Sequence, residues 1–241
     1  MKLTTVEGMQ SEIFVPITPK PVFTELKKPI NECKVAFITA GGIHRKDDKP
    51  FNTSGDFSYR VIPFDTPSDQ LMVTHGGFDN SDINKDVNAM FPIDRLHELV
   101  EEGYIGSLPK ESYTFMGGGG NVEKFINETG PEIARKLKEQ DVDIVLCTGG
   151  CGTCHRTATI VTRACEEAGM SCAVIAALPP IARQQGAPRI VAAHVPIGSN
   201  AGAPNDPVMQ TAILKDSLQW IKDCPSYNST KMLPYEYRHN V

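Results

Sequence analysis

Two cysteines with C-x-x-C spacing, Cys151 and Cys154, are the residues of this sequence whose types and spacing point most directly to chemistry. They follow an apolar run at residues 142–148 and a glycine pair, and residues 155–169 have the pattern of a helix. A cysteine on such a strand-to-helix turn lies near the positive N-terminal end of the helix, where the thiolate is favoured over the thiol. We therefore predict a redox-active nucleophile at Cys151, with Cys154 close enough to form a disulfide with it.

Zinc binding is a second interpretation of this segment, which contains four residues of zinc-ligand type, Cys147, Cys151, Cys154 and His155. Cys147, however, is expected to be buried within the apolar strand. The sequence also has no second Cys/His pair at the spacing of a zinc finger or ribbon. Redox chemistry is therefore favoured over zinc, and no metal site is predicted.

Covalent haem attachment is a third interpretation, since Cys151-Gly-Thr-Cys154-His155 matches C-x-x-C-H. That attachment requires an export route, a distal ligand and an apolar slot for the haem. Here the motif is expected between a core strand and its helix, so haem is disfavoured. A purely structural role is also less favoured than chemistry, because an exposed, glycine-flanked pair of cysteines contributes little to packing.

A second polar cluster, residues 74–88, surrounds His75, which follows an apolar tetrapeptide and precedes two glycines. This pattern places His75 at the end of a strand, and we predict a catalytic role for it. His155 is also predicted to be catalytic, because a histidine beside the thiols can manage protons. Four further residues are predicted to line the substrate or partner surface: His44, Asp79, Asp86 and Thr153. For Asp79, an ordinary helix cap in a solvated loop remains an open alternative.

Composition limits the possible classes of protein. The chain has 241 residues, 40% of them hydrophobic, which is enough for a sizeable core without metals or disulfides. A net charge of -5 and an isoelectric point near 5.7 argue against a nucleic-acid surface. No apolar run reaches the roughly 18 residues of a membrane span, and the N-terminus has no signal-peptide pattern. We therefore expect a cytoplasmic protein with no membrane span.

Cysteine usage agrees with a reducing compartment. The seven cysteines form an odd number with irregular spacing. A framework of structural disulfides is therefore not expected, and Cys147, Cys165 and Cys172 are interpreted as small buried side chains.

The order of expected elements predicts an α/β fold with a largely parallel sheet flanked by helices. The apolar strand at 142–148, the helix after the cysteines and a strand at 171–177 form a βαβ unit, whose strands are parallel. Pro-rich residues 1–30 are interpreted as an extended arm, residues 31–225 as the catalytic domain and residues 226–241 as a polar C-terminal tail.

An internal similarity suggests a further level of organisation. Phe37-Ile-Thr-Ala-Gly-Gly-Ile-His-Arg45 and Leu146-Cys-Thr-Gly-Gly-Cys-Gly-Thr-Cys-His-Arg156 both run from a strand through Gly-Gly to His-Arg. Two similar lobes, at about 31–110 and 111–225, facing each other across a cleft would explain it, and coincidence would explain it equally well. In either case both loops are expected at the carboxyl ends of strands, where open α/β sheets bind ligands.

The segment Cys147-Thr-Gly-Gly-Cys-Gly-Thr-Cys-His-Arg-Thr-Ala-Thr159 resembles the selenoprotein B family of glycine, sarcosine, betaine and D-proline reductases. The similarity extends to His75-Gly-Gly-Phe-Asp79, to Asn88-Ala-Met-Phe-Pro-Ile-Asp-Arg-Leu96 and to Pro196-Ile-Gly-Ser-Asn-Ala-Gly-Ala-Pro204. In length and motifs the chain is most similar to one branch of that family, the small selenocysteine-bearing subunits of D-proline reductases.

The redox motif of that family is selenocysteine-x-x-Cys. The resemblance therefore implies that position 151 is the selenocysteine position and that Cys154 is the resolving cysteine. The sequence has sulfur at position 151. Weaker reductive activity is expected from this form, because a thiol is less acidic and less nucleophilic than a selenol.

The reaction that the resemblance implies is the reductive ring cleavage of D-proline to 5-aminovalerate. A pyruvoyl group on a separate, larger partner subunit activates the substrate nitrogen, residue 151 attacks the α-carbon, and Cys154 attacks the adduct. No cofactor is expected in this chain, so electrons would come by thiol exchange from an external thiol or electron-transfer protein. The alternative is a thiol–disulfide carrier or a zinc-binding module without substrate chemistry of its own.

Overall fold

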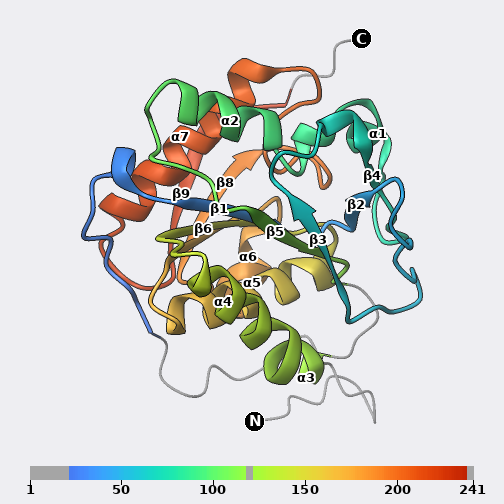
Figure 1. The fold of residues 1–241 in the computed structure, drawn as a ribbon, viewed down its shortest axis with the longest axis horizontal. Helices are drawn as coiled ribbons and strands as arrows, with labels where there is room; N and C mark the ends of the chain where they lie inside the picture. Colours follow the sequence, from blue (N-terminus) through green and yellow to red (C-terminus); the bar gives the residue numbers. More distant parts are fainter. Residues whose placement is uncertain (1–21, 118–121, 238–241) are drawn as a thin grey trace.

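A computed structural model describes residues 22–117 and 122–237 of the chain. In these residues a seven-stranded sheet lies between two layers of helices (Figure 1). A two-stranded sheet lies at one end of the molecule. The predicted α/β fold with a largely parallel sheet flanked by helices is confirmed. None of the helices in the described ranges is long and apolar enough to cross a membrane.

The described strands of the large sheet follow the order β3-β5-β1-β6-β7-β8-β9. Strand β3 is antiparallel to β5, and the other five pairs are parallel. The bounds of these strands are β1 Val35–Thr39, β3 Tyr59–Pro63, β5 Glu111–Phe115, β6 Ile144–Thr148, β7 Ser171–Ile175, β8 Arg189–His194 and β9 Ser229–Glu236. The small sheet pairs β2, Ile43–Arg45, with β4, Leu71–Val73.

Helices cover the sheet on both faces, so its central strands β1, β6 and β7 are buried along their whole length. In β1, Val35 and Phe37 belong to the core formed with α2, Ile93–Glu101, and α7, Pro207–Asp223. Their neighbours Ala36 and Ile38 point to the opposite face, where they pack in the core formed with α4, Gly130–Glu139, and α5, Gly152–Glu167. The remaining helical elements are short: η1 Ile30–Glu32, η2 Ser68–Gln70, α1 Ser81–Lys85, η3 Val87–Ala89, α3 Val122–Lys124, η4 Phe125–Thr129 and α6 Pro179–Gln184.

Helix α5 begins earlier than its sequence pattern predicts. It starts at Gly152 rather than at His155, and it ends at Glu167, two residues before Gly169 takes the positive φ of 85° that glycine favours. Apolar periodicity could not reveal this start, because the first turn is Gly-Thr-Cys. As a result Cys151 is the N-cap residue and Cys154 lies within the first turn.

Strand β1 lies between β5 and β6 in the sheet, so strands that follow it in the sequence lie on both sides of it. Thr39 pairs with Thr148, and the Ala40 N–H donates to the Thr148 carbonyl over 2.9 Å. The two Gly-Gly loops therefore lie side by side at the carboxyl edge of the sheet, as expected from the internal similarity. Strands from both suggested lobes, 31–110 and 111–225, join this one sheet, and separate lobes are not confirmed.

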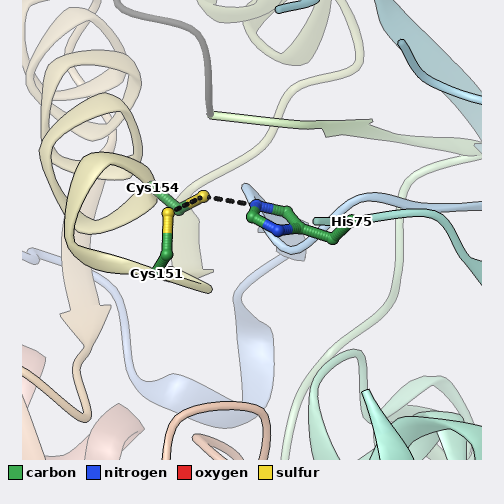
Figure 2. Close-up of side chains that lie close together, drawn as sticks. All are labelled: His75, Cys151 and Cys154. Atoms are coloured by element: carbon green, nitrogen blue, oxygen red, sulfur yellow. Dashed lines mark hydrogen bonds between the residues drawn. The ribbon is translucent and has the colours of Figure 1, made fainter. Parts of the chain in front are cut away.

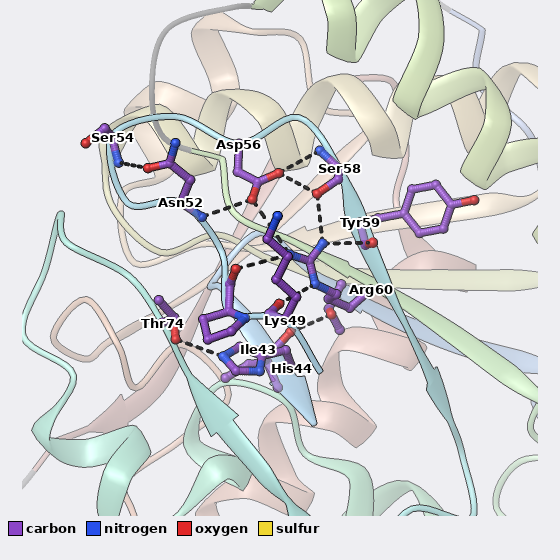
Figure 3. Close-up of polar contacts among 12 residues, drawn as sticks. Ile43, His44, Lys49, Asn52, Ser54, Asp56, Ser58, Tyr59, Arg60 and Thr74 are labelled. Atoms are coloured by element: carbon purple, nitrogen blue, oxygen red, sulfur yellow. Dashed lines mark hydrogen bonds and ion pairs between the residues drawn. The ribbon is translucent and has the colours of Figure 1, made fainter. Parts of the chain in front are cut away.

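The small sheet brings a second loop to the same edge. The Thr74 N–H donates to the Gly42 carbonyl over 2.9 Å, which fixes the end of β4 beside the loop after β1. The preceding polar stretch, residues 44–69, is held in place by Arg60, whose guanidinium donates to the Lys49 carbonyl (Figure 3). The guanidinium also stacks over the Phe51 ring at 4.2 Å. This stretch joins β2, which carries His44, to β4, which Thr74 directly follows.

The prediction of a polar C-terminal tail at residues 226–241 is wrong for residues 229–236. Residues 229–236 form β9, which pairs in parallel with β8 at the edge of the sheet. Its side chains are half-exposed and it contains Pro234, so its sequence lacks the apolar run of a central strand. Residues 238–241 lie outside the described part of the chain.

The predicted N-terminal arm is described only from residue 22. Residues 22–29 contain no helix or strand. Thr24 is nevertheless held to the body of the protein, because its hydroxyl donates to the Glu166 carbonyl and its own carbonyl accepts from Arg189. Residues 1–21 of the arm lie outside the described ranges.

If β9 belongs to the fold, shortening its buried side chain must destabilise the protein. Leu233 is 2% exposed, so we expect Leu233→Ala to lower the free energy of unfolding by about 2–5 kcal/mol. The neighbouring Met232 is 51% exposed, and Met232→Ala should change the free energy of unfolding by about 0.5 kcal/mol at most. Urea denaturation of both variants measures the difference. Equal, small effects would mean that β9 is a detachable tail.

Candidate active site

The two thiols of the C-x-x-C motif lie at the N-terminus of α5. Their sulfur atoms are 3.1 Å apart (Figure 2). Cys151 is partly exposed, whereas Cys154 is fully buried beneath it. Only a small movement is needed to bring the sulfurs to the roughly 2.0 Å of a disulfide bond.

The two thiols differ in acidity. A hydrogen bond from the Cys154 thiol, with help from His75 and the Cys154 backbone N–H, lowers the pKa of Cys151 to about 3 against the opposing effect of burial. Burial, together with the neighbouring Cys151, raises the pKa of Cys154 well above its ordinary value. The reduced pair is therefore a Cys151 thiolate that accepts a hydrogen bond from the Cys154 thiol. This asymmetry suits an attacking group at Cys151 and a resolving group at Cys154.

His75 completes a cluster of three side chains. It lies just after β4 and reaches across to the helix, where its Nε2 is 2.8 Å from the Cys154 sulfur (Figure 2). The Asn80 side chain donates to the His75 carbonyl over 2.8 Å, which fixes the backbone of the loop. The predicted position of His75 at a strand end is thus observed, and its partner is Cys154.

Hydrogen bonding determines which ring nitrogen of His75 carries the proton. The Gly77 backbone N–H donates to Nδ1 over 2.8 Å, so Nδ1 must present a lone pair. The ring proton is therefore on Nε2, which donates to the Cys154 sulfur. A chain of donors runs from His75 through the Cys154 thiol to the Cys151 thiolate.

This arrangement also bears on metal binding. His75, Cys151 and Cys154 are the described residues whose ligand atoms lie close enough together, within 4.8 Å of one another, to hold one ion. A histidine that binds a metal through Nε2 must carry its proton on Nδ1 and donate it to an acceptor. Here Nδ1 faces a donor instead, so the loop opposes metal binding. The set of ligands considered from the sequence does not form either, because the Cys147 thiol lies buried in β6.

The proton-transfer role predicted for His155 does not fit its position. The ring is fully buried, its Nδ1 donates to the Cys151 carbonyl over 2.9 Å, and its Nε2 accepts the Leu178 N–H over 3.1 Å. Burial lowers its pKa. Because both ring nitrogens are bonded to backbone groups, His155 holds the start of α5 against the loop after β7. The histidine that contacts the sulfurs is His75.

Two of the predicted lining residues lie close in sequence to His75 and to the two cysteines. His44 is buried, and its Nε2 is 2.8 Å from the Thr74 hydroxyl, one residue before His75 (Figure 3). Thr153 is partly exposed on the first turn of α5, between the two cysteines in the helix. His44 therefore supports the chain that follows β4, directly before His75.

The two acidic candidates have structural roles. Asp79 is exposed and accepts hydrogen bonds from the Ser81 backbone and hydroxyl, so it caps the start of α1, the ordinary alternative that the sequence left open. Asp86 accepts hydrogen bonds from the side chains of Gln210 and Asn88 and from two backbone N–H groups. These donors lower its pKa although burial acts to raise it. With its oxygens occupied in this way, Asp86 is unsuited to orienting a substrate.

Sequence reasoning missed Phe78. Its ring packs against the His75 ring with centroids 4.6 Å apart. It also lies so close to Gly150 that a Cβ at that position would come within 2.5 Å of the ring. An aromatic residue directly after a histidine and two glycines was the available signal, but only the fold brings it against the cysteine loop.

Asn200 was also missed as an individual residue, although its loop was quoted as part of a motif. Its side-chain amide donates to the Gly149 carbonyl over 2.7 Å and to the Ile175 carbonyl over 3.2 Å. It thereby joins the carboxyl ends of β6 and β7 directly before Cys151.

Two cavities of the described chain lie away from the thiols. One of about 720 Å³ is lined by the start of α7 and the end of β9, including Val208 and Tyr237. Another lies between α4 and α5. Neither is lined by Cys151, Cys154 or His75, so the reactive sulfur is reached from the open surface rather than from these cavities.

The acidity of Cys151 predicts its reactivity. Between about pH 8 and about pH 5 its rate of alkylation by iodoacetamide should stay nearly constant, because a thiol with a depressed pKa remains ionised while ordinary thiols become protonated. Cys154→Ala should raise the pKa of Cys151 by removing its hydrogen-bond donor, and Cys154→Ser should raise it less because the hydroxyl still donates. A Cys151 rate that falls tenfold per pH unit below pH 8 would contradict this geometry.

The tautomer of His75 leads to an expectation for metal content. The reduced chain, purified without chelators and exchanged into metal-free buffer, should retain far less than one zinc ion per chain in elemental analysis. One tightly held zinc ion that is lost in His75→Ala would show that the imidazole turns over to bind metal.

Comparisons with known proteins identify the family of this chain. The family model for glycine/sarcosine/betaine reductase selenoprotein B matches residues 3–150, which end directly before Cys151. D-proline reductase subunit gamma of Acetoanaerobium sticklandii is 57% identical over 235 residues, covering 98% of this chain and 97% of that protein. No solved structure matches the chain significantly.

More distant relatives are longer. Glycine reductase complex component B subunit gamma of Symbiobacterium thermophilum is 30% identical over 83% of this chain and 50% of its own length. Sarcosine reductase complex component B subunit beta of Peptoclostridium acidaminophilum is 32% identical over 78% of this chain and 45% of its own length. The chain thus spans about half the length of these relatives. Because the family model matches more than half of this chain, the chain belongs to the glycine/sarcosine/betaine reductase selenoprotein B family.

Proposed function

We propose that this chain is the redox-active subunit of a D-proline reductase and that residue 151 is its nucleophile. The observation that carries the proposal is the thiol pair: a partly exposed Cys151 with a pKa of about 3 and a buried thiol 3.1 Å away. The choice of D-proline rests on the 57% identical relative, which is named a D-proline reductase subunit.

In the first step the Cys151 thiolate attacks the α-carbon of D-proline and forms a carbon–sulfur bond. The ring C–N bond breaks, and the departing nitrogen takes up a proton to become the free amine of an open chain. The low pKa of Cys151 supports this step, because the attacking sulfur is ionised at neutral pH without a general base.

In the second step Cys154 loses its proton and attacks the sulfur of Cys151. The carbon–sulfur bond breaks, the α-carbon takes up a proton, and 5-aminovalerate leaves with the two electrons that the thiols give up. The product on the protein is a Cys151–Cys154 disulfide. An external dithiol then reduces that disulfide by exchange and is itself oxidised.

A partner chain is needed to hold the substrate amine. The ligand-type atoms clustered at the two sulfurs belong to His75, Cys151 and Cys154, with no carboxylate of the described residues among them. A pyruvoyl carbonyl on a larger subunit would supply the electrophile that activates the amine. The open surface at Cys151 fits a site that is completed by another chain, and relatives of this protein are named as components of complexes.

Position 151 is also the place where we propose selenocysteine in the native protein. The N-terminus of α5 and the donating Cys154 thiol favour an anion at this position, and a selenol ionises more readily than a thiol. Selenium is also the better leaving group when Cys154 attacks the adduct. The same geometry would therefore promote both steps more strongly with selenium than with sulfur.

A thiol–disulfide carrier is the second candidate, because the same sulfur pair can exchange with other disulfides. The two functions differ in what residue 151 bonds to. A carrier reduces protein or small-molecule disulfides without its partner subunit, whereas the reductase cleaves a C–N bond only in the assembled complex.

Removing the nucleophile separates these functions. In the assembled complex, Cys151→Ser should lower the rate of 5-aminovalerate formation from D-proline by at least about a thousandfold, since a hydroxyl with an ordinary pKa replaces a thiolate. Assembly, followed by size-exclusion chromatography, should be unchanged. Cys165→Ser is a matched control, because Cys165 lies buried further along α5. Undiminished activity of Cys151→Ser would refute the reductase role, and insulin-disulfide reduction by the isolated wild-type chain would favour the carrier.

A further inference from the structure

Phe78 lies between the histidine loop and the two glycine loops at the edge of the sheet. On one side its ring packs against His75 at a centroid distance of 4.6 Å and an interplanar angle of 49°. On the other side the ring lies against Gly150 and Gly198, which have no side chains. A Cβ at Gly150 would come within 2.5 Å of the ring, and a Cβ at Gly198 would come within 3.4 Å of it. The ring is thus held by backbone that Asn200 ties to β6 and β7.

The same loop supplies the group that orients the imidazole. Gly77 precedes Phe78, and its N–H donates to Nδ1 of His75, which leaves the proton on Nε2 for Cys154. Gly77 also lies close to the reacting groups, because a Cβ there would come within 2.9 Å of the His75 ring and 3.2 Å of the Cys151 sulfur. A shift of Phe78 would move Gly77 and so change both the tilt of the imidazole and its hydrogen bond.

We propose that Phe78 is a positioning residue that holds His75 as the Nε2–H tautomer against Cys154, and that this contact sets the redox equilibrium of the thiol pair. The proposal deepens the proposed function and rests on its thiol pair. Its test needs neither D-proline nor the partner subunit, so its failure would leave the ring-opening reaction untouched.

The direction of the effect follows from charge. The disulfide takes up two electrons and one proton to give the Cys151 thiolate and the Cys154 thiol, while an external dithiol is oxidised. A donor aimed at the sulfurs stabilises this anionic reduced pair more than it stabilises the neutral disulfide. Losing the donor therefore shifts the equilibrium toward the disulfide and makes the pair a stronger reductant.

The test is the equilibrium of the full-length cysteine form with mixtures of reduced and oxidised dithiothreitol, followed by mass spectrometry of the alkylated thiols. His75→Ala should shift the equilibrium constant toward the disulfide by about tenfold, equal to about 30 mV for this two-electron couple. Phe78→Leu should shift it in the same direction by about fivefold, because the histidine remains but is no longer held.

A double-mutant cycle distinguishes positioning from a general loss of packing. If Phe78 acts through His75, Phe78→Leu has no further effect in the His75→Ala background. Phe57→Leu is the matched control, because Phe57 is also half-buried but packs edge-on against Phe125, and it should leave the equilibrium unchanged. Equal shifts for Phe78→Leu in both backgrounds, or no shift in either, would overturn the proposal.

A measurement on the unmodified chain keeps the proposal testable if the Phe78 variant fails to fold. Nitrogen-15 NMR of the histidine rings distinguishes the two neutral tautomers. The reduced wild-type chain should show the Nε2–H form at His75, identified by its loss in His75→Ala. A wild-type His75 protonated at Nδ1 instead would contradict the hydrogen bond from Gly77 on which the proposal depends.

Discussion

The hydrogen bond between the Cys154 thiol and the Cys151 thiolate is the interaction on which the proposed chemistry of this protein depends. It is only possible because one sulfur is buried and protonated while the other is partly exposed and ionised. The first turn of α5 provides this difference, since Cys151 lies at the helix N-cap and Cys154 lies one turn further, against the core. Without Cys154, Cys151 would lack the hydrogen-bond donor that lowers its pKa. Without Cys151, Cys154 would have no sulfur to attack.

The sheet topology provides the second requirement, a fixed meeting point for loops far apart in sequence. Because β1 lies between β5 and β6, the loops after β1 and β6 leave the same edge of the sheet. The small sheet of β2 and β4 then carries His75 to Cys154, 79 residues away in sequence. Residues 196–202 close the edge from the other side, where Asn200 binds the carbonyls at the ends of β6 and β7. The reactive sulfur therefore lies on a rigid platform rather than on a free loop.

Much of this arrangement could be predicted from local patterns, and the errors have physical causes. The strand at residues 144–148, the helix after it and the strand at 171–175 were predictable because each is an apolar run with a clear start or stop. The role assigned to His155 failed because successive residues on a helix point about 100° apart, so the neighbour of Cys154 faces a different loop. Proximity along a helix is a poor guide to which side chain serves a sulfur.

Contacts between distant segments were not available from the sequence in the same way. His75 was identified by its place at a strand end, but nothing local indicated that Cys154 would be its partner. Phe78 was missed because its importance comes from two glycines elsewhere in the chain that leave room for its ring. Strand β9 was missed because an edge strand that is half-exposed shows no continuous apolar run.

Membership of a reductase family and a polarised thiol pair together lead to one central claim, that residue 151 forms a covalent bond to the substrate. The most direct measurement is mass spectrometry of the Cys154→Ser variant in the assembled complex after incubation with D-proline. The serine hydroxyl still donates to the Cys151 sulfur but cannot resolve an adduct. The account requires the peptide containing residue 151 to gain the mass of the ring-opened substrate. An unmodified peptide, with product still formed at the wild-type rate, would contradict it.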